Sequence, residues 1–120
     1  MSKGTDLRAS GEQGITAEQK CKAAEALAMT AGHLASIDPD RDIDELAFAA
    51  VLGAKVYDVG GRSGSGGGVR ISRLALEAVG EVPDGVTRVE FAVTVAQAAR
   101  TLGYDWSTDD NRRLVEGVAG

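Results

Sequence analysis

The stretch from Asp42 to Val59 constrains the fold more than any other, because it is apolar on nearly every side. One apolar set recurs three, four and seven residues apart, the spacing that lines one face of an α-helix. This set comprises Ile43, Leu46, Ala47, Ala50, Ala54 and Tyr57, and a second set covers much of the remaining surface with Phe48, Val51, Leu52 and Val59. A helix that is apolar nearly all round is buried among other helices or against a partner. We therefore expect a buried central helix over Asp42–Val59, with the other elements packed on it.

Local signals mark both ends of this expected helix. Asp42 and Glu45 have the spacing of a capping box, with aspartate in place of the usual serine or threonine. Asp44 and Glu45 add negative charge in the first turn, where the helix dipole favours it. Gly60 and Gly61 follow the last apolar residue, so we expect the helix to end there.

A second helix is expected from Thr16 to about Ser36, because Thr16 and Gln19 form a capping box. Its apolar positions are Cys21, Ala24, Leu27, Ala28, Ala31, Leu34 and Ala35. Cys21 lies in this line and is therefore interpreted as a small core residue. His33 lies in the last turn, where the helix C-terminus favours its positively charged form.

Two interpretations compete for residues 69–95. The spacing over Val69–Val79 predicts a helix, and Thr87 with Glu90 forms a capping box that predicts another helix over Arg88–Leu102. However, Val89 to Val95 also alternate in the manner of a strand, and the turn at Pro83–Gly85 would then join a β-hairpin. The helical interpretation is favoured because the alanine-rich continuation and Gly103 agree with it.

The expected fold is all-α, a single compact bundle of about five helices, with an α+β fold containing one hairpin as the alternative. Residues 1–14 are polar and are interpreted as a flexible N-terminal tail; residues 15–120 form one helical domain. A short fifth helix is expected after Asp110. Trp106 is the only tryptophan. It either seals the junction between the last two helices or, if exposed, is a candidate interface residue.

Composition excludes several classes of function. The net charge of −5 disfavours broad binding to nucleic acid or acidic membranes. A single cysteine permits neither an internal disulfide nor a multi-cysteine metal site. No export signal or apolar run of membrane-spanning length is evident, so we expect a cytoplasmic protein without a membrane partner. No set of residues matches a catalytic, metal or cofactor motif, which favours a protein without enzymatic activity.

The glycine-rich loop at residues 60–68 is the most compositionally biased segment of the chain. It is interpreted first as a linker or exposed loop. The alternative is an anion-binding or nucleotide-binding loop whose backbone N–H groups hold a phosphate. In that case its candidate residues are Arg62, Ser63, Ser65 and Arg70. The established phosphate-binding motifs are absent.

The segment Val95–Val118 gives a further alternative, because its first part resembles the opening of a helix-turn-helix. Arg112 and Arg113 are the candidate nucleic-acid contacts. The intervening turn is long, and Asp109 and Asp110 would face phosphates. Nucleic acid is therefore the less favoured partner.

The absence of recognisable chemistry and the largely apolar central helix favour a non-catalytic protein–protein interaction subunit. It would act as an adaptor or homo-oligomer within a larger assembly, including one of viral or mobile-element origin. A DNA-binding regulator and a small anion-binding domain are the alternatives.

Overall fold

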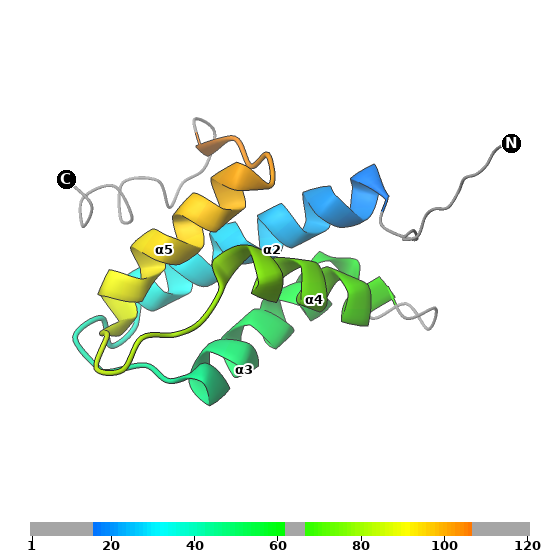
Figure 1. Ribbon diagram of the computed structural model, residues 1–120. Helices are drawn as coiled ribbons and strands as arrows, with labels where there is room; N and C mark the ends of the chain where they lie inside the picture. Colours follow the sequence, from blue (N-terminus) through cyan, green and yellow to red (C-terminus); the bar gives the residue numbers. More distant parts are fainter. Residues whose placement is uncertain (1–15, 62–66, 107–120) are drawn as a thin grey trace, which may run out of the picture.

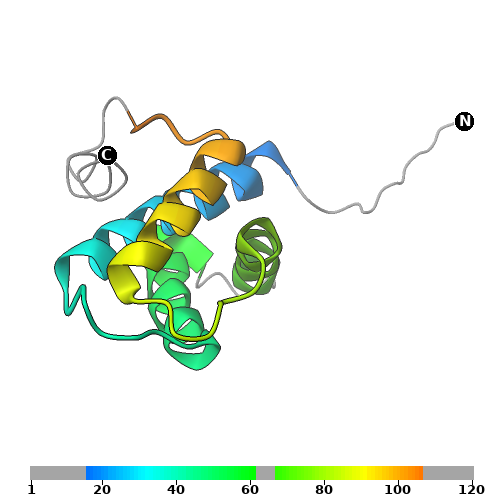
Figure 2. The same ribbon diagram turned by 60° about the vertical axis from the view of Figure 1, so that its left-hand side comes forward.

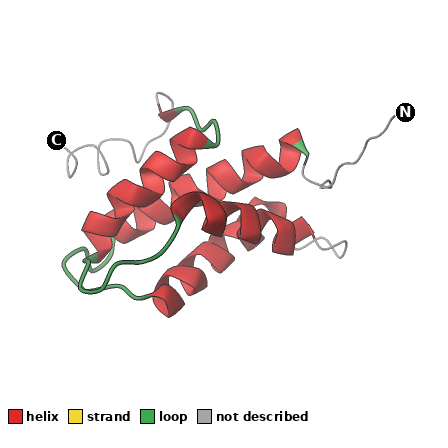
Figure 3. Ribbon diagram, in the orientation of Figure 1, coloured by secondary structure: helices red, strands yellow, loops and turns green. Residues whose placement is uncertain are grey.

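The computed structural model describes residues 16–61 and 67–106, and these form four α-helices with no strand among them. The helices are α2 (Ala17–Ser36), α3 (Glu45–Val56), α4 (Gly67–Val79) and α5 (Arg88–Thr101). A π-helical turn, η1 (Tyr57–Gly61), follows α3 directly. The helices pack into a compact bundle (Figures 1 and 3). The all-α prediction is therefore confirmed for this part of the chain, and the hairpin alternative is wrong. The expected fifth helix lies outside the described residues.

Helix α2 is the element around which the others are arranged, since α3, α4 and α5 all pack against it (Figure 2). It is as long as predicted, and the capping box of Thr16 and Gln19 is formed. Its inward face is built mainly of small side chains; the buried residues are Ala23, Ala24, Ala26, Leu27, Ala28, Thr30, Ala31, Gly32 and Leu34. The one buried hydroxyl, that of Thr30, donates to the carbonyl of Ala26 at 2.8 Å. Small side chains on α2 leave room for three neighbouring helices to approach it.

The prediction of a buried central helix at Asp42–Val59 is wrong. Helix α3 buries only Phe48, Leu52 and Val56, which recur every fourth residue along one side. From the other apolar set, Leu46 (81% exposed), Ala50, Ala54 and Tyr57 face outward, whereas Ile43, which precedes the helix, is buried. Both sets have helical spacing, but the set with the larger side chains has more apolar area to remove from water, and this set faces α2.

Two aromatic rings link α3 to α5 inside the core. Phe48 and Phe91 meet edge to face, with ring centroids 5.0 Å apart and an angle of 84° between their planes. Both side chains are almost fully buried. An edge-to-face pair contributes about 0.5–1.5 kcal/mol beyond its buried area. This contact therefore joins α3 to α5 within the core.

The loops that precede α3 and α5 are joined by backbone hydrogen bonds. Asp42 and Thr87 form an isolated antiparallel bridge, and the loops run side by side (Figure 3). The N–H of Ile43 donates to Val86 at 2.9 Å, and the N–H of Arg88 donates to Arg41 at 2.8 Å. Because Asp42 is held in this extended bridge, the predicted cap moves by two residues. Asp44 caps α3 instead and accepts from the N–H of Ala47 at 2.8 Å.

Helix α5 begins where its capping box predicts. The hydroxyl of Thr87 accepts from the N–H of Glu90, and the carboxylate of Glu90 accepts from the N–H of Thr87 at 2.9 Å. The hydrogen bond from the backbone N–H of Thr87, and then the Thr87 side chain, lower the pKa of the Glu90 carboxyl, since they favour its ionised form. The two hydrogen bonds of the capping box also satisfy two N–H groups at the start of the helix. A strand has no such cap, which explains why the alternation of Val89 to Val95 does not decide the structure.

Candidate interaction surface

The large hydrophobic side chains that remain exposed are concentrated on one face of the molecule. Among the described residues, four of the five belong to α3, η1 or α4: Leu46 (81% exposed), Tyr57 (56%), Val69 (63%) and Leu76 (40%). The fifth is Ile37, in the turn after α2. Between Leu46 and Tyr57 the outward positions of α3 carry Ala49, Ala50 and Gly53, which are also exposed. We call the surface formed by these seven residues, without Ile37, the α3–α4 face: Leu46, Ala49, Ala50, Gly53, Tyr57, Val69 and Leu76.

A groove opens in this face between the second half of α3 and the first half of α4. Its volume is about 550 Å³. One wall is formed by Gly53, Val56 and Tyr57, and the other by Gly68, Val69, Ser72, Arg73, Leu76 and Glu77. Most of this lining is apolar, and it includes neither histidine nor cysteine. The groove therefore offers mainly apolar contact, with the charged side chains of Arg73 and Glu77 in its lining.

Helix α4 is positioned by its own amphipathic pattern and by the turn that precedes it. Ile71 and Ala75, four residues apart, are buried, while Val69 and Leu76 lie on the outer side. At the end of α3, Gly60 has φ +107° and ψ 13°, a conformation that other L-residues rarely adopt. This glycine interrupts the helical conformation at the end of η1 and lets the chain leave the line of α3. Both helices that line the groove thus have local signals in the sequence, and their packing decides which sides line it.

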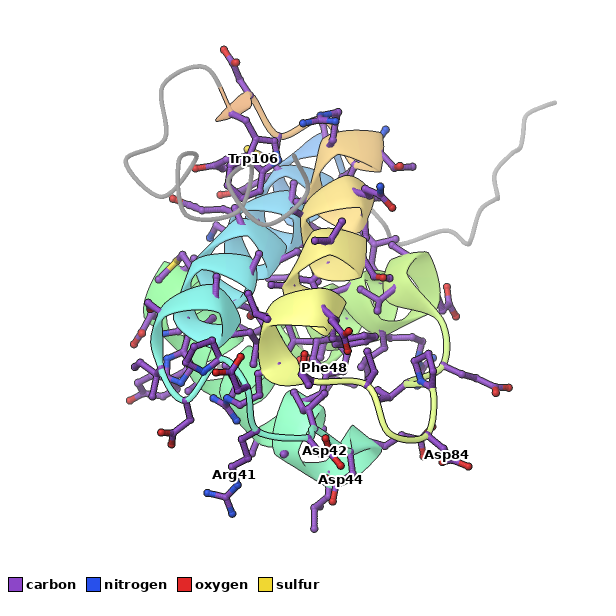
Figure 4. The ribbon with its side chains drawn as sticks, turned by 90° about the vertical axis from the view of Figure 1, so that its left-hand side faces the viewer. Arg41, Asp42, Asp44, Phe48, Asp84 and Trp106 are labelled. Carbon is purple, nitrogen blue, oxygen red and sulfur yellow. The ribbon has the colours of Figure 1, made fainter. Side chains whose placement is uncertain are left out.

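Charge is distributed unevenly along α3. A second cavity, of about 650 Å³, lies at its N-terminal end and is lined by five carboxylates and no basic side chain: Asp42, Asp44, Glu45, Glu81 and Asp84. Figure 4 shows Asp42, Asp44 and Asp84 together at the end of the molecule away from Trp106. The bases Lys55, Arg70 and Arg73 belong to the C-terminal half of α3 and the first half of α4. Lys55 lies near His33 of α2, whose pKa it lowers, whereas Arg73 lines the groove together with Glu77. The α3–α4 face therefore has an acidic end, and its other end carries Arg70 and Arg73 with Glu77.

The residues predicted for the anion loop and for nucleic-acid contact are mostly outside the described part of the chain. Arg62, Ser63, Ser65, Arg112 and Arg113 all lie there, so these predictions stay predictions. Arg70 lies near the start of α4 with an exposed side chain.

Trp106, the candidate interface residue, is only 6% exposed. Its indole N–H donates to the carbonyl of Ala96 at 3.3 Å. Its ring meets Tyr104 edge to face, with centroids 5.0 Å apart. The indole therefore presents little surface to a partner, and it ties the segment after α5 back onto that helix (Figure 4).

Two local predictions on α2 are wrong. Cys21 is exposed rather than part of the core, because α2 turns its neighbours Ala23 and Ala24 inward instead. His33 does not favour its charged form: burial, and then the positive charges of Lys55 and Arg88, lower its pKa. These effects act in the direction opposite to that of the helix C-terminus and outweigh it.

Gly53 is a sequence signal for the α3–α4 face. Gly53 stands in the interior of α3, where glycine costs about 1 kcal/mol relative to alanine. A Cβ atom added to Gly53 would meet nothing within 4 Å. The packing of the chain thus gives no reason for this glycine, whereas close approach of another molecule would.

Within residues 16–61 and 67–106, no group of three or more histidine, cysteine, aspartate or glutamate side chains is placed to hold a metal ion. In the same residues, no helix combines the length and apolar character needed to cross a membrane. Comparison of the chain with protein-family models, with curated proteins and with solved structures finds no match. Function must therefore be argued from the surface itself.

Proposed function

We propose that this chain is a non-catalytic protein–protein interaction subunit that binds its partner through the α3–α4 face. The observation that carries the proposal is the concentration of exposed large apolar side chains on this face. Contiguous apolar surface on a small domain marks an interaction site more often than an accident of packing. The acidic rim at one end and the bases at the other give such a surface a polar border, as interfaces have.

A protein partner fits this face better than a small ligand. A molecule bound in the groove would cover Tyr57, Val69 and Leu76. It would leave Leu46 in water, because Leu46 does not line the groove and is the most exposed of the four. A helix or a second folded surface laid along α3 would cover all four side chains at once, which is how an amphipathic partner binds a helical groove.

The proposal is tested by photo-crosslinking the full chain in the cells that make it. A photoreactive amino acid is introduced at position 46 or 76, both on the face, and at position 97 as the control. Gln97 is exposed on α5, away from the face. We expect light-dependent protein adducts from positions 46 and 76 and none from position 97. If positions 46 and 76 form no more adducts than the control, this face does not bind protein and the proposal is wrong.

A further inference from the structure

We infer that the partner of the α3–α4 face is a second copy of this chain, with the two α3 helices packed antiparallel about a two-fold axis. This inference rests on the proposed function and specifies its partner. Three observations lead to it: the unexplained glycine on α3, the uneven distribution of charge along α3, and a protruding leucine that complements the groove.

The first observation is the small outer surface of α3. Ala49, Ala50 and Gly53 are exposed side by side at helical spacing, and the space above Gly53 is open. The distance between packed helices, about 8–10 Å, depends on the side chains at the contact. A helix that lies across these three positions can approach to the short end of that range.

The second observation is charge. Asp44 and Glu45 lie at the N-terminal end of α3, where they line the acidic cavity. Arg70 and Arg73 lie on the first half of α4, which forms the groove with the C-terminal half of α3. A surface with opposite charges at its two ends is complementary to itself only when the second copy is reversed. A two-fold axis perpendicular to α3 reverses the second copy. Every contact across the interface then occurs twice, between the same two patches.

The third observation is shape. With the axis crossing α3 near Ala50, Leu46 of one copy comes beside Gly53 and the groove of the other copy. The most exposed of the large apolar side chains, Leu46 at 81%, then enters the groove of about 550 Å³ and occupies part of it. The same operation places Glu45 of each copy near the partner's groove, whose charged lining residues are Arg73 and Glu77. The complementary pair is Glu45 with Arg73.

The size of the face sets the strength that we expect. Helix α3 has 12 residues and is therefore about 18 Å long. A face two helices wide and of that length buries roughly 400 Å² on each copy, about 800 Å² in total, which is below the size of stable complexes and in the range of weak, transient ones. The dimer should accordingly be weak, and its association must be measured up to high protein concentration.

The test uses sedimentation velocity on the full chain and two single charge reversals, Glu45→Lys and Arg73→Glu. Each reversal places like charges together at two symmetric positions. Exposed ion pairs are individually weak, but each reversal turns two symmetric attractive pairs into repulsive ones, which together should raise the dimer Kd by about tenfold. An equimolar mixture of the two variants restores opposite charges at both positions, so it should regain the wild-type Kd. Glu25→Lys on α2 and Arg100→Glu on α5, both exposed and off the face, are the matched controls and should leave the Kd unchanged.

The outcomes separate this inference from the proposed function. If the wild-type chain stays monomeric, while photo-crosslinks from position 46 join it to a protein of another mass, the second copy is the wrong partner and the proposed function stands. If the wild type dimerises but the mixture does not recover, the antiparallel arrangement is wrong. If positions 46 and 76 give no adduct, both proposals fail.

Discussion

Replacement of Gly53 by alanine should stabilise the isolated chain. Gly53 lies inside α3, where alanine is favoured over glycine by about 1 kcal/mol. It has no positive φ, and the added Cβ atom meets no other atom within 4 Å. Neither backbone strain nor a steric clash therefore opposes the gain. We expect the free energy of unfolding to rise by about 0.5–1 kcal/mol, part of it from the reduced freedom of the unfolded chain.

Gly60→Ala is the matched control, because it makes the same chemical change in a position where the structure predicts the opposite sign. Gly60 has φ +107°, and an added Cβ atom would lie 3.1 Å from Nζ of Lys22. The lysine end is flexible and can move away, so most of the cost is the backbone conformation, about 1–3 kcal/mol. Gly60→Ala should therefore lower the free energy of unfolding.

Urea denaturation followed by circular dichroism measures both variants. The chain must be dilute, since dimerisation would add its own stabilisation to the folded state. With an m-value of about 1.5 kcal/mol/M, Gly53→Ala should move the midpoint up by roughly 0.3–0.7 M. At high concentration the same variant should sediment more as monomer, because the methyl group enters the proposed helix contact.

A loss of stability in dilute Gly53→Ala would refute this reasoning. It would mean that another part of the chain fills the space above Gly53, so that the α3–α4 face is not open to a partner. A gain in stability with no change in self-association would leave the folding argument intact and would remove the glycine from the evidence for close helix contact.

Two further predictions test the core and the charges. Leu52→Ala should cost about 2–5 kcal/mol of unfolding free energy, because Leu52 is 1% exposed; Leu46→Ala, on the same helix at 81% exposure, should change it by less than about 0.5 kcal/mol. Equal losses in dilute urea titrations would contradict the assignment of the two faces of α3. The pKa of His33, the only histidine, should lie below 6.5 in an NMR titration. Since the folded state then binds this proton less readily than the unfolded state, the contribution of His33 to stability is present above pH 6.5 and falls as the pH drops through the folded pKa. Two results would contradict the predicted sign. One is a folded pKa at or above 6.5, and the other is stability that rises as the pH drops through that window only when His33 is present.

The sequence by itself determined the helices and several of their ends. Thr16 with Gln19 and Thr87 with Glu90 start α2 and α5 as predicted. Such signals work because a cap is completed by residues within four positions of one another, so nothing distant is needed. The helical interpretation of Val69–Val79 is confirmed for the same reason, since amphipathic spacing is a local property.

Tertiary structure alone decided which side of α3 is buried. The periodicity identified two apolar sets on this helix, but periodicity contains no information about where the neighbouring helices lie. The contacts with α2 and Phe91 bury Phe48, Leu52 and Val56, and this leaves Leu46 and the small residues beside it as the candidate site. The shift of the cap from Asp42 to Asp44 has the same origin, because the residue that holds Asp42 is Thr87, far along the chain. Local signals thus set the elements, whereas contacts between distant residues set the surface on which function depends.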